Sequence, residues 1–131
     1  MNIKTATPSM TAYQTILLIF SELVKKGKTI LSQDKFVENL YREFLSTTDE
    51  DTKSLFEDIS FHNHWTYVTS VDIEDSLCML QTYGAIGRLN PAYEKIVIYI
   101  SSKDADKFIN SYDKKFAAAA NKVADDISEK I

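Results

Sequence analysis

Residues 71–100 read VDIEDSLCMLQTYGAIGRLNPAYEKIVIYI, and this stretch decides the class of the fold. Its first half places apolar side chains at helical spacing and ends at Gly84, a residue type that readily terminates a helix. The pattern predicts a helix over about 71–83 whose inward side chains are Ile73, Leu77 and Leu80.

The second half of the stretch predicts a β-hairpin over 86–100. Asn90-Pro91 marks its turn, and the run KIVIYI at 95–100 is the strongest strand signal in the chain. Alternate residues of a strand share a face, so we expect the buried face to carry Ile96, Ile98 and Ile100.

A helix and a short strand are expected near the N-terminus. Residues 1–8 look like a short polar lead. Thr11 and Gln14 have capping-box spacing just before a periodic apolar segment, which predicts a helix over about 11–26. The β-favouring residues 29–31 predict one short strand.

Two further helices are expected before the deciding stretch. Ser32 is a suitable cap for a helix over about 33–46, and Thr47 or Thr48 is expected to start the next one, with acids in its first turn. Residues 60–70, SFHNHWTYVTS, break the periodicity and predict an extended loop or one irregular strand.

The C-terminal segment is expected to be one long helix. Neither Gly nor Pro occurs from 103 to 131. An uninterrupted helix over about 103–130 would reach about 40 Å. Its apolar stripe either folds back on the first helix or pairs two copies of the chain. The predicted fold class is mainly α (α+β), with five helices and one β-hairpin in a single domain over 1–131.

The order of these elements resembles a winged-helix domain. The resemblance covers residues 11–100 and is carried by the strand at 29–31, the helix at 71–83 before the wing, and the wing at 86–100. It implies a transcriptional regulator that binds DNA. The alternative is a plain helical domain to which a hairpin is appended.

Composition narrows the class of partner. The net charge is −4, which disfavours nucleic acid and anionic membranes as partners because both reward a basic surface. The single cysteine, Cys78, excludes an internal disulfide and fits a reducing compartment. We find neither a signal peptide nor a membrane-spanning segment in the sequence, and we expect a cytoplasmic protein.

Charge is concentrated in the middle of the chain. Residues 49–75 hold eight acids against Lys53 alone, a net charge of −7, whereas 1–48 and 76–131 carry +2 and +1. Aromatic residues lie in the same segment. The predicted partner-binding residues are Asp49, Glu50, Asp51, Glu57, Asp58, Trp65, Tyr67, Asp72, Glu74 and Asp75.

Carboxylates around aromatic anchors suit the capture of a basic protein, because charge steers the encounter and buried aromatic side chains supply affinity. The first hypothesis is therefore a non-enzymatic protein-binding module, such as an immunity or antitoxin-type inhibitor whose partner is a basic toxin. The opposing interpretation holds that the acids only cap helices and that Phe61 and Trp65 are core residues.

The regulator hypothesis meets a difficulty in the same segment. A recognition helix over 71–83 would present Asp72, Glu74 and Asp75 to DNA without one Lys or Arg. We therefore expect no binding to nucleic acid.

Catalytic and metal chemistry have little support. His62 and His64 could supply half of a metal site or an acid–base pair in a small nuclease, but the sequence offers no strong third ligand. Cys78 lies between apolar neighbours and is expected in the core. We expect no cofactor, no metal and no enzymatic activity.

Overall fold

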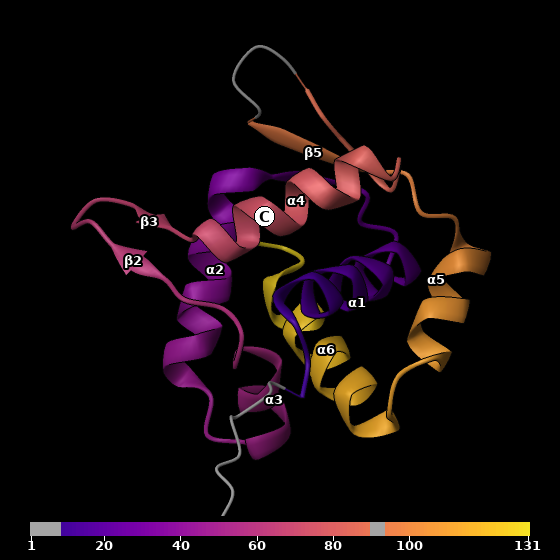
Figure 1. Cartoon of the computed structure of the whole chain (residues 1–131), viewed down its shortest axis with the longest axis horizontal. Helices are drawn as coiled ribbons and strands as arrows, with labels where there is room; N and C mark the ends of the chain where they lie inside the picture. Colours follow the sequence, from indigo (N-terminus) through magenta and orange to yellow (C-terminus); the bar gives the residue numbers. More distant parts are fainter. Residues whose placement is uncertain (1–8, 90–93) are drawn as a thin grey trace, which may run out of the picture.

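The computed structural model describes residues 9–89 and 94–131. These residues form six helices and two small antiparallel sheets, so the mainly α (α+β) class is confirmed (Figure 1). The elements are α1 (Ala12–Lys25), β1 (Ile30–Ser32), α2 (Gln33–Ser46), α3 (Glu50–Leu55), β2 (His62–Asn63), β3 (Val68–Thr69), α4 (Val71–Thr82), β4 (Ile86–Arg88), β5 (Lys95–Ile98), α5 (Ser102–Asn110) and α6 (Lys114–Ile127).

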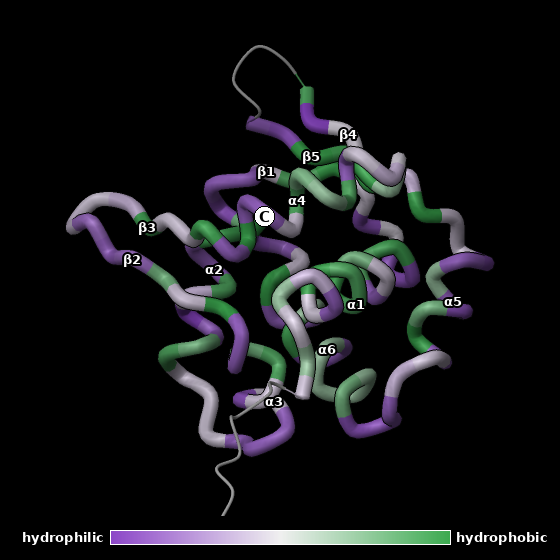
Figure 2. Tube along the Cα trace, viewed as in Figure 1, coloured by the Kyte–Doolittle hydropathy of each residue, from purple (hydrophilic) through white to green (hydrophobic). Residues whose placement is uncertain are grey.

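Helix α1 lies at the centre of the molecule. Its N-terminus has the predicted capping box, in which Thr11 accepts from the backbone of Gln14 and the Gln14 side chain returns the bond. The helix packs against α4, α5 and α6, and it is the most uniformly apolar helix in the interior (Figures 1 and 2). Side chains on all its faces are buried, namely Ile16, Leu18, Ile19, Phe20 and Leu23. Each contributes about 1.5–3 kcal/mol by leaving water.

The larger sheet has the strand order β1-β5-β4. Its hairpin is antiparallel, as predicted, and Ile96, Ile98 and Ile100 are all buried. The predicted turn at Asn90-Pro91 lies outside the described residues. Strand β1 adds to the hairpin through β5, with Leu31 opposite Ile96.

The predicted helices α2 and α4 are confirmed. Ser32 and Ser70 cap their N-termini through side-chain hydrogen bonds, and Gly84 ends α4 at a φ of 80°. Helix α3 begins one to two residues later than predicted, because Asp49, not Thr47 or Thr48, accepts the capping hydrogen bond from the Thr52 backbone.

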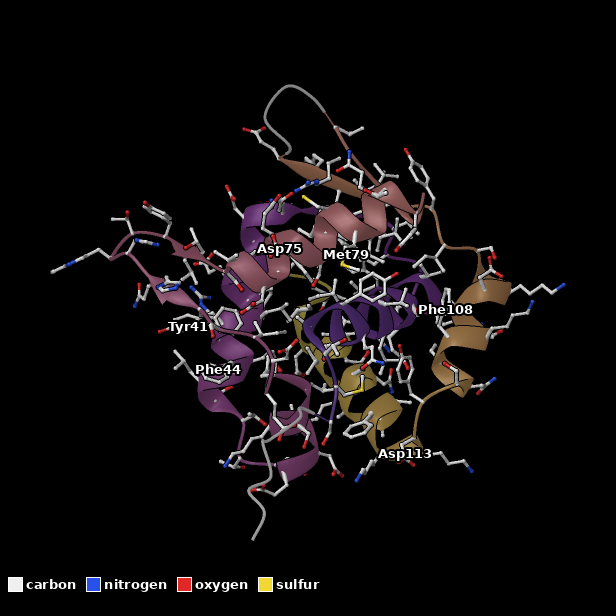
Figure 3. The ribbon with its side chains drawn as sticks, in the orientation of Figure 1. Tyr41, Phe44, Asp75, Met79, Phe108 and Asp113 are labelled. Carbon is white, nitrogen blue, oxygen red and sulfur yellow. The ribbon has the colours of Figure 1, made fainter. Side chains whose placement is uncertain are left out.

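The prediction of one long C-terminal helix is wrong. Helix α5 ends at Asn110 and α6 starts at Lys114, so the chain has six helices where five were expected. Ser111 donates its hydroxyl to the Phe108 carbonyl at 2.7 Å, and the chain turns before Asp113 (Figure 3).

The turn between α5 and α6 lets both helices cover α1. Helix α5 is held by the Lys25–Asp106 ion pair at 2.9 Å, while α6 lies against α1, α2 and α3. A straight helix could not reach both faces. The apolar stripe of α6, which could have paired two copies of the chain, is buried within one chain, at Phe116, Ala119, Ala120, Val123, Ala124 and Ile127.

The segment 60–70 also differs from its prediction. It forms a second hairpin, β2–β3, where a loop or one irregular strand was expected. The hairpin projects from the side of the molecule next to α2 (Figure 1). The winged-helix resemblance stays a prediction. None of the described helices is long and apolar enough to cross a membrane.

We predict that one carboxyl pair makes stability depend on pH. Burial and the neighbouring charge of Asp126 raise the pKa of Glu43 from 4.5 to about 7. Because the folded state holds this proton more tightly than the unfolded chain, the contribution of Glu43 to stability is complete below about pH 4.5 and is lost as pH rises through about 7. Glu43→Gln should remove that decline, a difference on the order of 1 kcal/mol after solvent screening.

Urea denaturation between pH 4 and pH 8 measures the difference curve between wild type and Glu43→Gln. The control is Glu129→Gln, which changes an exposed carboxylate three residues after Asp126. A difference curve that is flat for Glu43→Gln would show that the pair has no effect on folding.

Candidate functional site

The base of the β2–β3 hairpin is fixed to the body by hydrogen bonds. The backbone N–H of Ser60 donates to the Asp72 carboxylate at 2.7 Å. At the other end, the Ser70 hydroxyl accepts from the backbone N–H of Ile73 at 3.2 Å and starts α4. The two ends of the segment are thereby held at the N-terminus of one helix.

An aromatic cluster holds the same base against α2 and α3. Phe61 lies 5.3 Å from Tyr41 and 5.4 Å from Phe44 between ring centroids, and Phe44 lies 5.9 Å from Phe56. Tyr41 and Phe44 lie on the side of α2 from which the hairpin projects (Figure 3). Phe61 is therefore packed against the core, in agreement with the opposing interpretation of the sequence, which placed it there.

The hairpin tip, residues 64–67, has the opposite character. Trp65 is 97% exposed and has a φ of 79°, and it is the only residue other than glycine with a positive φ in the described parts of the chain. A bulky side chain in this conformation costs about 1–2 kcal/mol. The opposing interpretation, which placed Trp65 in the core, is wrong for this residue.

The tip is ordered by its own contacts. The backbone N–H of His64 donates to the Tyr67 carbonyl at 2.8 Å, and the two rings stack with centroids 4.6 Å apart. The backbone N–H of Trp65 donates to the Asn63 side chain at 3.2 Å. Tyr67 remains 59% exposed, so its free surface is the ring face opposite His64 and the ring edge.

A groove of about 570 Å³ separates the hairpin from α2. We call it the hairpin groove; the residues that matter for its chemistry are Asp34, Glu38, Tyr41, Arg42, Trp65 and Tyr67. A second depression of about 320 Å³, the apolar pocket, continues from it toward α4 and shares Asp34, Val68 and Thr69 with it.

Five of the eight predicted acids accept hydrogen bonds that support the fold. Glu57 accepts from the Ser9 backbone at 3.0 Å and Asp58 from the Ala12 backbone at 2.7 Å, both at the start of α1. Asp72 accepts from the Ser60 backbone, and Glu74 accepts from the Arg88 guanidinium. Asp49 accepts from the Thr52 hydroxyl and backbone N–H, and these bonds lower its pKa.

The other three acids lie at the surface without such roles. Glu50 is 3.8 Å from Lys53, and Asp51 is partly exposed on the same helix. Asp75 lies on the outer side of α4, next to Met79 (Figure 3). The predicted acids therefore lie on α3, on the residues that flank it and on α4, and none of them lines the hairpin groove. Of the predicted site residues, only Trp65 and Tyr67 line it.

The acids of the groove itself come from α2. Asp34 and Glu38 are one helical turn apart and face the hairpin, and sequence reasoning missed them because they lie outside the acidic segment. Their i, i+4 spacing on an otherwise ordinary helix was the only signal. This spacing indicates a site only once the structure shows that the hairpin lies opposite these two residues.

Helix α4 forms an ion pair with Arg88, a partner that sequence analysis did not predict for it. The Arg88 guanidinium, whose side chain is 5% exposed, contacts Glu74 at 2.8 Å, Gln81 at 2.9 Å and the Cys78 sulfur at 3.2 Å. Burial lowers the pKa of Arg88, but the hydrogen bonds and charges of Glu74 and Cys78 together outweigh it and leave that pKa raised. Cys78 is exposed, so its predicted place in the core is wrong.

The histidine pair lies on the hairpin. The two rings are 6.3 Å apart, and the His64 Nε2 atom lies 2.9 Å from the Thr69 hydroxyl. Within residues 9–89 and 94–131, no three or more His, Cys, Asp or Glu side chains gather as metal ligands would.

Comparisons of the chain with protein-family models, curated proteins and solved structures gave no match.

The strain at the tip is testable by stability. We predict that Trp65→Gly raises the free energy of unfolding by about 0.5–1 kcal/mol, because glycine adopts a positive φ without steric cost and the exposed indole contributes no core packing. The matched control is the neighbouring Thr66→Gly, where φ is not positive and glycine should lower stability by about the same amount. Equal destabilisation by both changes, in chemical denaturation, would contradict the strain.

Proposed function

We propose that this protein is a non-enzymatic binding module that captures a basic protein partner through the hairpin tip and the hairpin groove. One observation carries the proposal: Trp65, the only tryptophan, is almost fully exposed in a strained conformation beside a groove. Folding alone favours neither the exposure nor the strain. Tryptophan is the residue type most enriched at the energetic centre of protein interfaces.

Charge supports the basic character of the partner. The carboxylates of residues 49–75 keep their charge when they accept hydrogen bonds from backbone N–H groups, so they still contribute to the field around the hairpin. Asp34 and Glu38 add acids inside the groove. Such a field speeds association with a positively charged surface and discourages acidic ones.

The class of protein that fits best is a small inhibitor of the immunity or antitoxin type, acting in the cytoplasm on a basic toxin. An aromatic tip held beside acids supports this assignment. A homodimer through the C-terminal helices has less support, because the apolar stripe of α6 is already covered.

The alternative function is a winged-helix regulator that binds DNA. It is favoured by the sheet that joins β1 to the β4–β5 hairpin, with α4 preceding that hairpin. The exposed residues at one-turn spacing along α4 and its C-cap are Val71, Asp75, Met79 and Tyr83, which offer no cation to phosphate. The charge of Arg88 is already engaged by Glu74.

We predict that duplex DNA binds no tighter than about micromolar at physiological salt, because non-specific affinity comes from phosphate neutralisation. Fluorescence anisotropy with labelled duplexes of mixed sequence measures this. Nanomolar binding that weakens steeply with salt would favour the regulator over the inhibitor.

The proposed anchor is tested by capture and kinetics. A partner taken from extract of the native host by the wild type should be basic, and Trp65→Ala should lose it through faster dissociation, by at least about tenfold. Thr66→Ala is the control, since it changes the adjacent tip residue without removing an aromatic side chain. Capture by Trp65→Ala at the wild-type rate constants would refute the proposal.

Steering by charge is tested separately. We expect the triple variant Glu50→Gln, Asp51→Asn and Asp75→Asn to slow association, with a difference that shrinks as salt is added. These three acids lack the structural hydrogen bonds of their neighbours, so the fold should be unaffected.

The control for steering neutralises three exposed acids outside residues 49–75. They are Asp104→Asn on α5, Asp113→Asn in the turn before α6, and Glu129→Gln after the end of α6. Both variants change the net charge equally. If the two triple variants slow association equally, the rate depends on the net charge of the protein and not on the acids of residues 49–75.

A further inference from the structure

The hairpin groove contains a carboxylate that forms no hydrogen bond or ion pair with another side chain of the described residues. Asp34 lies in the first turn of α2, exposed to solvent and lining both the hairpin groove and the apolar pocket. Within the described residues, no hydrogen bond or ion pair joins its side chain to another group. This distinguishes it from the acids of 49–75 that cap helices or fix the hairpin.

The groove already holds one guanidinium. Arg42 contacts Glu38 at 3.1 Å, and both side chains line the groove next to Tyr41. This contact is exposed on both sides, so it contributes little to stability and can exchange with an external cation. Two carboxylates and one guanidinium leave the lining with a net charge of −1.

Aromatic walls complete the site. Tyr41, Trp65 and Tyr67 line the groove, and His64 covers one face of Tyr67 and leaves the other accessible. A planar guanidinium suits such surroundings better than an ammonium does, because it stacks on aromatic faces and donates to carboxylates at the same time.

The adjoining apolar pocket extends the site. Its accessible apolar side chains are Val71 and the half-buried Val68, above a floor of buried core residues, Val37, Ile73 and Leu77. Asp34 lies at the border between the two depressions. A segment lying across both depressions would meet an acidic site, suited to a cation, and then an aliphatic one.

We propose that the two depressions form one site for a partner segment that presents an arginine to Asp34 and the aromatic walls of the hairpin groove, and an aliphatic side chain to the apolar pocket. Arg42 already occupies Glu38, the other carboxylate of the groove. This inference deepens the proposed function, on which it rests, by naming the chemistry of the partner surface.

The probes are short acetylated peptides that carry one arginine and one leucine, separated by one, two or three glycines. Matched peptides replace arginine by citrulline, which keeps the shape and removes the charge, or leucine by serine. Binding to the full chain is followed by amide chemical shifts and by the fluorescence of Trp65, the only tryptophan.

We expect at least one spacing to shift the amides of Asp34, Trp65 and Tyr67. The citrulline peptide should bind at least about tenfold more weakly, and the serine peptide more weakly as well. Equal affinity of the arginine and citrulline peptides, or shifts confined to α3, would overturn the inference.

Two substitutions address the groove itself. Asp34→Asn should weaken the arginine peptide by about tenfold or more, whereas Asp104→Asn, an equal charge change on α5, should leave it within about twofold. Arg42→Gln should strengthen binding, because it removes a like charge from the groove and releases Glu38. Lys35→Gln removes the same charge from α2 outside the groove lining and should strengthen it less.

Failure of this inference differs from failure of the proposed function. Loss of the natural partner by Trp65→Ala, together with no peptide shifts at Asp34, would overturn the arginine site and keep the binding module. Peptide binding at Asp34, together with unchanged capture by Trp65→Ala, would support the arginine site and refute the proposed function.

Discussion

The requirement that α1 be covered on every side governs this structure. Helix α1 buries side chains that point in different directions, namely Ile16, Leu18, Ile19, Phe20 and Leu23. It therefore has to be enclosed by other elements and cannot lie at the surface of the protein. Even its polar side chains are accommodated internally: Thr15 donates to the Leu55 carbonyl at 2.7 Å and Ser21 to the Leu17 carbonyl at 2.8 Å. Helices α4, α5 and α6 are arranged around it, and the hairpin β2–β3 is left outside the shell they form (Figure 1).

Much of the fold could be predicted because local chemistry and burial agree. The capping box at Thr11, the positive φ of Gly84 and the buried alternation ending at Ile100 each follow from nearby residues. The break at 111–113 could not be predicted in this way. No glycine or proline marks it, and it exists because two faces of α1 have to be covered by one stretch of chain.

The candidate site was predictable only in part, for the same reason. Trp65 and Tyr67 were identified from composition, and both prove to be exposed beside a groove. The acids near them in sequence were assigned to the same surface, yet Asp58 caps α1 and Asp72 fixes the hairpin base. Asp34 and Glu38 reach the groove from α2, and proximity across space between elements is what a single sequence does not reveal.

The fixed base of the hairpin has a consequence for the thermodynamics of association. Asp72, the cap at Ser70 and the packing of Phe61 restrict the backbone before any partner arrives. The conformational entropy of the segment is therefore lost when the chain folds, and little remains to be lost on binding. The heat-capacity change of complex formation should then report the apolar surface that the indole and the groove remove from water, without a component from ordering the loop.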